Sequence, residues 1–115
     1  MKKFTIKTSK EVLYKDYLSV IQPILDITDK ELLILAELCK VQDKVTDKTL
    51  LPAVLSTETR KYIREKLQMS EAAFNNNISR LKKKDLISDV TGVNDKLLLR
   101  GITDIMFSFK VQEDV

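Results

Sequence analysis

The chain of 115 residues contains no histidine, a single cysteine and only two glycines, Gly92 and Gly101. Without histidine and with one cysteine, it cannot form a disulfide framework, a zinc finger or the Cys/His and Ser/His pairs of nucleophilic catalysis. Two glycines are too few for a glycine-rich loop around a phosphate. The cysteine, Cys39, follows Leu35 and Leu38 in an apolar stretch and is interpreted as a buried side chain rather than a reactive thiol. We therefore expect no enzyme activity, no metal and no cofactor.

Long hydrophobic runs are also missing from the chain. A typical apolar run is Leu32 to Ala36, far below the roughly 20 residues that a bilayer requires. The basic start, Met1 to Lys3, is followed by polar residues instead of an apolar signal core. Hydrophobic residues make up 43% and charged residues 32% of the chain, a balance typical of globular proteins. We expect one domain over residues 1–115, located in the cytoplasm and not in a membrane.

The net charge is only +3, but the charge is distributed unevenly. Residues 56–84 contain eight lysines and arginines against three glutamates, so this segment carries +5 and the remainder of the chain −2. Positive charge that is concentrated on about a third of a protein is typical of a surface for an anionic partner.

The N-terminal part of the chain predicts a strand and a helix within residues 4–25. Residues 4–7 alternate apolar and polar, and Thr8 to Glu11 have the spacing of a capping box, so the helix is expected from residue 9. Pro23 should end or kink this helix near Gln22. The core line is expected at Leu13, Tyr17, Val20/Ile21 and Ile24. A second apolar line is formed by Tyr14, Leu18, Ile21 and Leu25. This line marks helix 9–25 as a candidate homodimer contact, unless the terminal strands cover it.

The rest of the chain predicts three more helices and further strands. A second capping box, Thr28 to Glu31, opens a strongly apolar helix to Cys39, and residues 43–55 form a connector with a short extended stretch at 50–55. Ser56 and Ser70 cap helices that run to about Leu67 and to Lys84. Residues 86–90 and 96–100 are expected to form a β-hairpin around a turn at 91–95. Residues 106–111 alternate like residues 4–6 and are expected to pair with them.

The order of helix, short turn, helix and hairpin between Ser56 and Ile87 resembles the winged helix-turn-helix family. The segment from Thr28 to Ala36 is similar to the first helix of MarR-type regulators, and small phage winged-helix proteins are also similar at this level. The resemblance covers residues 27–100. It implies a mainly α fold with a small β component, and a recognition helix at 70–84 that enters the major groove of double-stranded DNA in a bacterium or a phage-infected cell.

Helical geometry divides the predicted recognition helix into two faces. Phe74, Ile78 and Leu81 form the core stripe, because they recur at i, i+4 and i+7. Turning about 100° per residue, the opposite face holds Ala72, Asn76, Ser79, Arg80 and Lys83, with Ala73 at its margin. Small alanines allow close approach to DNA, and asparagine and arginine suit base edges. The full predicted DNA-binding set is Ser70, Ala72, Ala73, Asn76, Ser79, Arg80, Lys82, Lys83, Lys84, Arg60, Lys61, Arg64 and Lys96.

Two functions follow from this pattern. The first is a DNA-binding transcriptional regulator, in which the lysine run 82–84 and the cations of the preceding helix contact the DNA backbone. The second is a winged helix used for protein–protein contact, for example as an adaptor or a virion-associated phage protein, because many such folds bind no DNA. The expected hairpin tip at 91–95 has no positive charge, which favours the second function.

Overall fold

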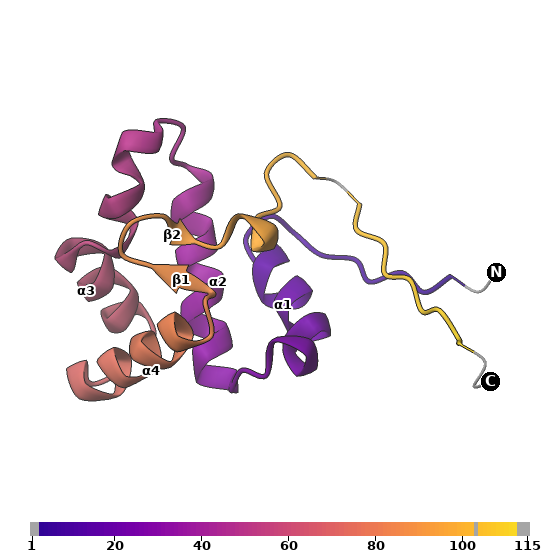
Figure 1. Cartoon of the computed structure of the whole chain (residues 1–115), viewed down its shortest axis with the longest axis horizontal. Helices are drawn as coiled ribbons and strands as arrows, with labels where there is room; N and C mark the ends of the chain where they lie inside the picture. The colour runs from indigo at the N-terminus through magenta and orange to yellow at the C-terminus, as the bar shows by residue number, and fades with distance from the viewer. Residues whose placement is uncertain (1–2, 103, 113–115) are drawn as a thin grey trace.

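The computed structural model describes residues 3–102 and 104–112. As the sequence predicts, the fold is mainly helical with a small β component. In chain order the elements are α1 (Leu13–Leu25), α2 (Asp29–Asp43), the 3-10 helix η1 (Lys48–Leu55), α3 (Thr57–Lys66), α4 (Glu71–Lys83), β1 (Ile87–Ser88), β2 (Gly92–Val93) and the 3-10 helix η2 (Asp95–Leu97). Figure 1 shows α2 in the middle of the molecule, with α1 on one side and α3 and α4 on the other.

Helix α2 is the centre of the core because it is apolar on nearly all sides. Ile34, Leu35 and Leu38 are fully buried, and the helix packs against α1, α3, α4 and the hairpin. The predicted cap at Thr28 is confirmed, since its hydroxyl accepts a hydrogen bond from the Glu31 amide at 3.2 Å and donates to the Glu31 carboxylate at 3.3 Å. Burial of most of its surface and a capped N-terminus explain why this helix is central to the fold.

Helix α1 begins later than predicted and ends at Leu25, as in the expected range 9–25. The capping box at Thr8 does not form: the Thr8 hydroxyl donates to the Asp16 carboxylate at 2.7 Å, and the helix begins at Leu13 without a side-chain cap. The helix also continues past Pro23 to Leu25 and stops where Asp26 turns left-handed at φ 53°. Pro23 lies in the last turn, where its missing donor costs one intrahelical bond and the ring can be accommodated.

The two apolar lines of α1 have exchanged roles relative to the prediction. Tyr14, Leu18 and Ile21, which were the candidate dimer contact, are buried in the chain's own core, whereas Ile24 is 80% exposed and Val20 44% exposed. Both lines satisfy the helical period, so only packing against α2 selects between them. The selection is reinforced by Tyr14, whose hydroxyl donates to Asp43 at 2.7 Å and accepts from the Leu99 amide at 2.8 Å.

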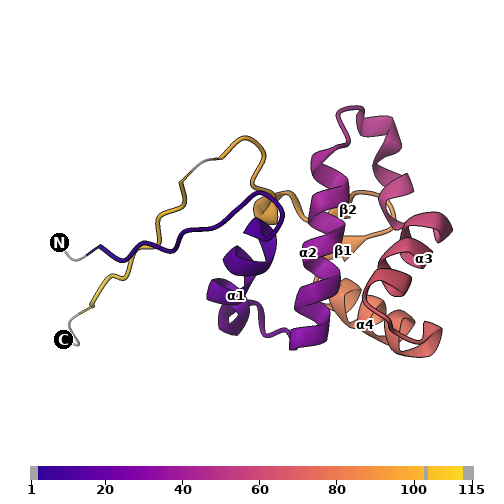
Figure 2. The same cartoon turned by 180° about the vertical axis from the view of Figure 1, so that it is seen from behind.

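The prediction of paired terminal strands at 4–6 and 106–111 is wrong. Within the described residues these segments are extended but form no ladder, and Phe4 and Phe109 are 90% and 97% exposed. Figures 1 and 2 show both segments leaving the body together on the α1 side. An isolated two-stranded ribbon is marginal in water, and here nothing covers its apolar face. One ring contact ties the C-terminal segment to α1, the stacking of Phe107 on Tyr17 at 6.3 Å between centroids.

The connector before α3 is helical where an extended stretch was expected at residues 50–55. Asp47 caps η1 by accepting from the Thr49 amide at 2.9 Å, and the end of η1 buries Val54 and Leu55. Leu55 is therefore a core residue immediately before Ser56, the cap of α3. The local sequence alone did not reveal this turn, because its stability comes from the two buried side chains.

The hairpin is present but shorter than predicted. Ile87 pairs with Val93 and Ser88 with Gly92, so the turn is 89–91 rather than 91–95. Residues 96–100 are not a strand: η2 intervenes, and Leu97 and Leu99 turn into the core. The pairing is shorter because η2 begins at Asp95, and the outer edge of β2 is occupied by a side chain.

That side chain is the buried Gln42 of α2. Its amide accepts from the Val93 amide at 2.6 Å and donates to the Val93 and Thr91 carbonyls at 3.2 and 3.3 Å. Gly92 makes the close approach feasible, because a Cβ at this position would lie 2.2 Å from Gln42 Oε1, and because its φ is +71°. The Gln42 side chain thus forms the hydrogen bonds that a third strand would form with β2, and it fixes the hairpin to the core.

Candidate nucleic-acid interface

Helices α3 and α4 are joined by a tight turn that both helix ends specify. Ser56 caps α3 by accepting from Thr59, and Ser70 caps α4 by accepting from Ala73, both as predicted. Between them Gln68 adopts a left-handed conformation at φ 54°, and the Met69 amide donates back to the Arg64 carbonyl at 3.0 Å. This is the hydrogen-bond pattern of a Schellman motif, and it sets the angle between the two helices.

The inner face of α4 holds the helix on the core. Phe74, Ile78 and Leu81 are at most 2% exposed, which confirms the predicted core stripe. Asn77 is also buried, and its side-chain amide donates to the Ala73 carbonyl at 2.8 Å. The three consecutive asparagines therefore have different environments: Asn77 is bonded within the helix, while Asn75 and Asn76 are exposed.

The outer face of α4 is open to solvent. All five residues predicted to read DNA, Ala72, Asn76, Ser79, Arg80 and Lys83, are exposed, and Ala73 is half-buried at the margin. In the described part of the chain the Lys83 ammonium forms no hydrogen bond or ion pair. Ser70 is exposed as well, but its hydroxyl is engaged as the helix cap.

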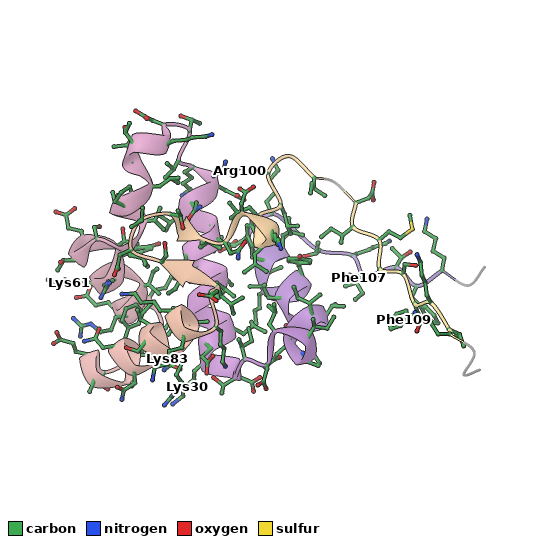
Figure 3. The ribbon with its side chains drawn as sticks, viewed as in Figure 1. Lys30, Lys61, Lys83, Arg100, Phe107 and Phe109 are labelled. Atoms are coloured by element: carbon green, nitrogen blue, oxygen red, sulfur yellow. The ribbon has the colours of Figure 1, made fainter. Side chains whose placement is uncertain are left out.

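A hollow of about 490 Å³ lies between this face and the start of α2. It is lined by Thr28, Asp29, Lys30, Ala73, Asn76, Asn77 and Arg80. The Arg80 guanidinium is oriented along its rim by a hydrogen bond to Asn77 Oδ1 at 3.4 Å. Lys30 and Lys83 both lie at the lower edge of the molecule in Figure 3. The sequence analysis missed Lys30, because only the packing of α2 on α4 brings it here.

Two of the predicted cations are ion-paired with Asp89 of the hairpin turn. Asp89 accepts from the Lys82 ammonium at 2.8 Å and from the Arg60 guanidinium at 3.2 Å. The hydrogen bond from Lys82 lowers the pKa of the Asp89 carboxyl, and the nearby positive charges act in the same direction. The Arg60 guanidinium also donates to the Leu55 carbonyl at 2.8 Å. Asp89 therefore ties α3, α4 and the hairpin together.

Lys84 points inward instead of toward solvent. Its ammonium donates to the Asp26 carbonyl and to the Glu31 carboxylate, the latter at 2.9 Å. Glu31 is only 1% exposed, so this ion pair is partly removed from water and joins the end of α4 to the start of α2. The ammonium of Lys84 is thus engaged within the protein.

The other predicted residues lie further from the outer face of α4. Lys61 is exposed on α3, apart from Lys30 and Lys83 in Figure 3, and Arg64 is half-buried one turn later. Lys96 lies on η2, which is next to the start of α1 and away from α4 (Figure 1). The structure therefore brings together the outer face of α4 and Lys30, and it leaves Lys96 elsewhere.

The described residues offer few other kinds of site. They contain no cluster of three or more His, Cys, Asp and Glu side chains that could hold a metal ion, and none of their helices is long and apolar enough to cross a membrane. Cys39 is fully buried, and burial raises the pKa of its thiol, which disfavours the reactive thiolate.

Comparison of the chain with models of protein families, with curated proteins and with solved structures finds no match.

Proposed function

We propose that this protein is a winged helix-turn-helix DNA-binding protein, acting as a transcriptional regulator, that inserts α4 in the major groove. The observation that carries the proposal is the division of α4. Its apolar stripe is fixed to the core, while Ala72, Asn76 and Arg80 lie on an exposed face with no acidic residue between positions 72 and 84. A helix that is anchored on one side and polar and basic on the other has the form of a recognition helix.

Each part of the outer face has a role in the proposed complex. The small side chains of Ala72 and Ala73 allow the N-terminal half of α4 to approach the base edges closely. Asn76 offers the donor and acceptor pair that suits adenine, and Arg80, oriented by Asn77, suits guanine. Lys83 and Lys30 flank this reader and would contact phosphates, which supply affinity but little sequence information.

The hairpin has a supporting role in this proposal. Its turn, 89–91, has no lysine or arginine, and Asp89 holds Arg60 and Lys82 in ion pairs. These two cations are engaged by Asp89 and the turn adds no positive charge of its own, so we expect recognition to depend on α4 and the start of α2 and not on the wing. Lys61 and Arg64 on α3 are the remaining candidates for backbone contacts.

The proposal is tested by binding selection from random duplex DNA, followed by titration of the selected site with single variants. Arg80→Ala and Lys83→Ala should each weaken binding by about 1–3 kcal/mol, and each lost phosphate contact should reduce the salt slope by about one unit. Only Arg80→Ala should also relax the sequence preference. Lys15→Ala on α1 removes the same charge outside the α3–α4 pair and is the matched control. Equal binding by the parent and both α4 variants would exclude this face as the site.

The alternative is a winged-helix module for protein–protein contact, for example an adaptor or a virion-associated phage protein. It is favoured by the acidic turn of the hairpin and by Val90 at its tip, which is 72% exposed. A gel shift at low salt separates the two functions, because electrostatic binding to DNA is strongest there. Failure to bind any duplex at low salt would favour the protein-contact function.

A further inference from the structure

Exposed apolar side chains are concentrated at one end of the molecule. Of the fourteen large hydrophobic residues that are exposed in the described part of the chain, eleven lie in α1 and in the two terminal segments. We name this surface the apolar end and define it by Val20 and Ile24 of α1 together with residues 4–12, 102 and 104–111. Its members are Phe4, Ile6, Val12, Val20, Ile24, Ile102, Ile105, Met106, Phe107, Phe109 and Val111. A folded chain seldom leaves such a patch uncovered.

We propose that the apolar end is the contact between two copies of this chain, which pack around a two-fold axis. Six of its side chains are at least 66% exposed: Phe4, Ile6, Ile24, Met106, Phe109 and Val111. At about 150 Å² for a phenylalanine side chain and less for the aliphatic ones, the six together expose somewhat less than about 900 Å² per copy. A stable interface of standard size buries about 800 Å² per partner, so the exposed area is of the size that a dimer of this chain requires.

The charges of the terminal segments fit a second copy of the chain as the partner. Residues 1–10 contain four lysines and no acidic residue, whereas residues 101–115 contain three acidic residues and one lysine. The N-terminal segment of one copy therefore attracts the C-terminal segment of the other, while two N-terminal segments repel each other. Each copy supplies both signs, as a self-complementary two-fold contact requires.

The alternation of apolar and polar residues in the two terminal segments is explained by strand formation in this dimer. Phe4 and Ile6 lie two residues apart, as do Phe107, Phe109 and Val111, so each segment would place its apolar side chains on one face of a strand. Two such strands are not stable alone, but three or more with an apolar face are. Two copies supply four segments and the exposed line of α1, so the strands that one chain does not form would form between two chains.

The dimer contact lies away from the proposed DNA-binding face. In Figure 1 the terminal segments extend on one side of α1, and α4 lies on the other side of the molecule. A two-fold dimer would thus leave both α4 helices accessible. A consequence, which does rest on the proposed function, is that the selected DNA site should consist of two inverted half-sites.

The test is sedimentation equilibrium of the full chain without DNA, over a wide range of concentration. We expect a dimer for the parent chain. Ile24→Asp and Phe109→Asp should each raise the dissociation constant at least about tenfold, because each places a charge in an apolar contact. Val90→Asp and Tyr62→Asp are the matched controls, since both residues are exposed outside the apolar end, at 72% and 57%. Circular dichroism checks that each variant is folded.

Two outcomes would overturn the dimer. One is a parent chain that is monomeric at every concentration, in which case the apolar end pairs within the chain or binds another protein. The other is a pair of Asp variants that dimerise as tightly as the parent. Failure of DNA selection with an intact dimer would count against the proposed function alone.

Discussion

The lysines at the end of α4 are ion-paired on one side of the helix and, in the described part of the chain, unpaired on its outer face. On the hairpin side, Lys82 is bound by Asp89, and at the end of the helix Lys84 is bound by the buried Glu31. On the outer face Lys83 lies between these two in sequence and has no partner within the described residues. Consecutive residues on a helix are turned by about 100°, so a run of three lysines is divided among three environments.

This comparison separates structural cations from cations that are available to a ligand. A lysine already bound to a carboxylate must break that pair before it can contact a phosphate, whereas an unpaired exposed lysine only sheds water. The total charge of residues 56–84 includes ion-paired side chains, so it is a poor measure of the charge that is available for binding. We therefore expect the outer face of α4 to contribute a larger share of the binding than this total charge implies. The ion-paired residues should contribute to stability instead.

The largest difference is expected between a buried residue of α4 and its exposed neighbour in the sequence. Phe74→Ala should lower the free energy of unfolding by about 4 kcal/mol, because it removes a fully buried ring and leaves a cavity. Asn75→Ala, at the next position and exposed, should raise it by about 0.5 kcal/mol, since alanine is the better helix former. Urea unfolding measures both. A large loss for Asn75→Ala would contradict the inference that this exposed side chain makes no structural contact.

The next test compares Lys84→Ala with Lys83→Ala. Lys84→Ala leaves the Glu31 carboxylate buried without its cation, which should cost about 3 kcal/mol. Lys83→Ala should change the free energy of unfolding by less than about 0.5 kcal/mol. The double variant Glu31→Leu with Lys84→Met removes both charges and should recover most of the loss. Equal unfolding midpoints for the two single variants would show that the ion pair with Glu31 does not stabilise the fold.

Much of the fold could be predicted from the sequence because its signals are local. The caps at Thr28, Ser56 and Ser70 and the stripe of Phe74, Ile78 and Leu81 all follow from interactions within one or two turns of helix. These features are confirmed. The outer face of α4 was predicted by the same reasoning, and its exposure is confirmed while its binding role stays a prediction.

The errors have one physical origin, because each depends on contacts between distant residues. The choice between the two apolar lines of α1 is made by packing on α2, and the hairpin is held on the core by Gln42, which lies 51 residues from Val93. The terminal segments show the correct alternation, but one chain offers nothing to cover them. Lys30 was missed for the same reason, since α2 meets α4 only in the folded protein.

The smallest expected effect concerns Asp89, which holds two cations on the hairpin side. Because the hydrogen bond from Lys82 lowers its pKa, Asp89 should titrate below the ordinary value of 3.8. A lowered pKa means that the pairs contribute stability above the ordinary value and lose it as the pH falls through the lowered one. The carboxyl is exposed, so the contribution to stability is small.

NMR titration of the Asp89 side chain measures this effect directly. In Lys82→Ala the midpoint should move upward toward the ordinary value, and in Arg60→Ala it should move less, because Arg60 forms the longer contact. In Lys83→Ala, which removes an equal charge from the outer face, the midpoint should stay close to that of the parent. A midpoint that responds equally to all three substitutions would mean that Asp89 senses only the overall charge. The distinction between paired and available lysines would then not apply at the hairpin.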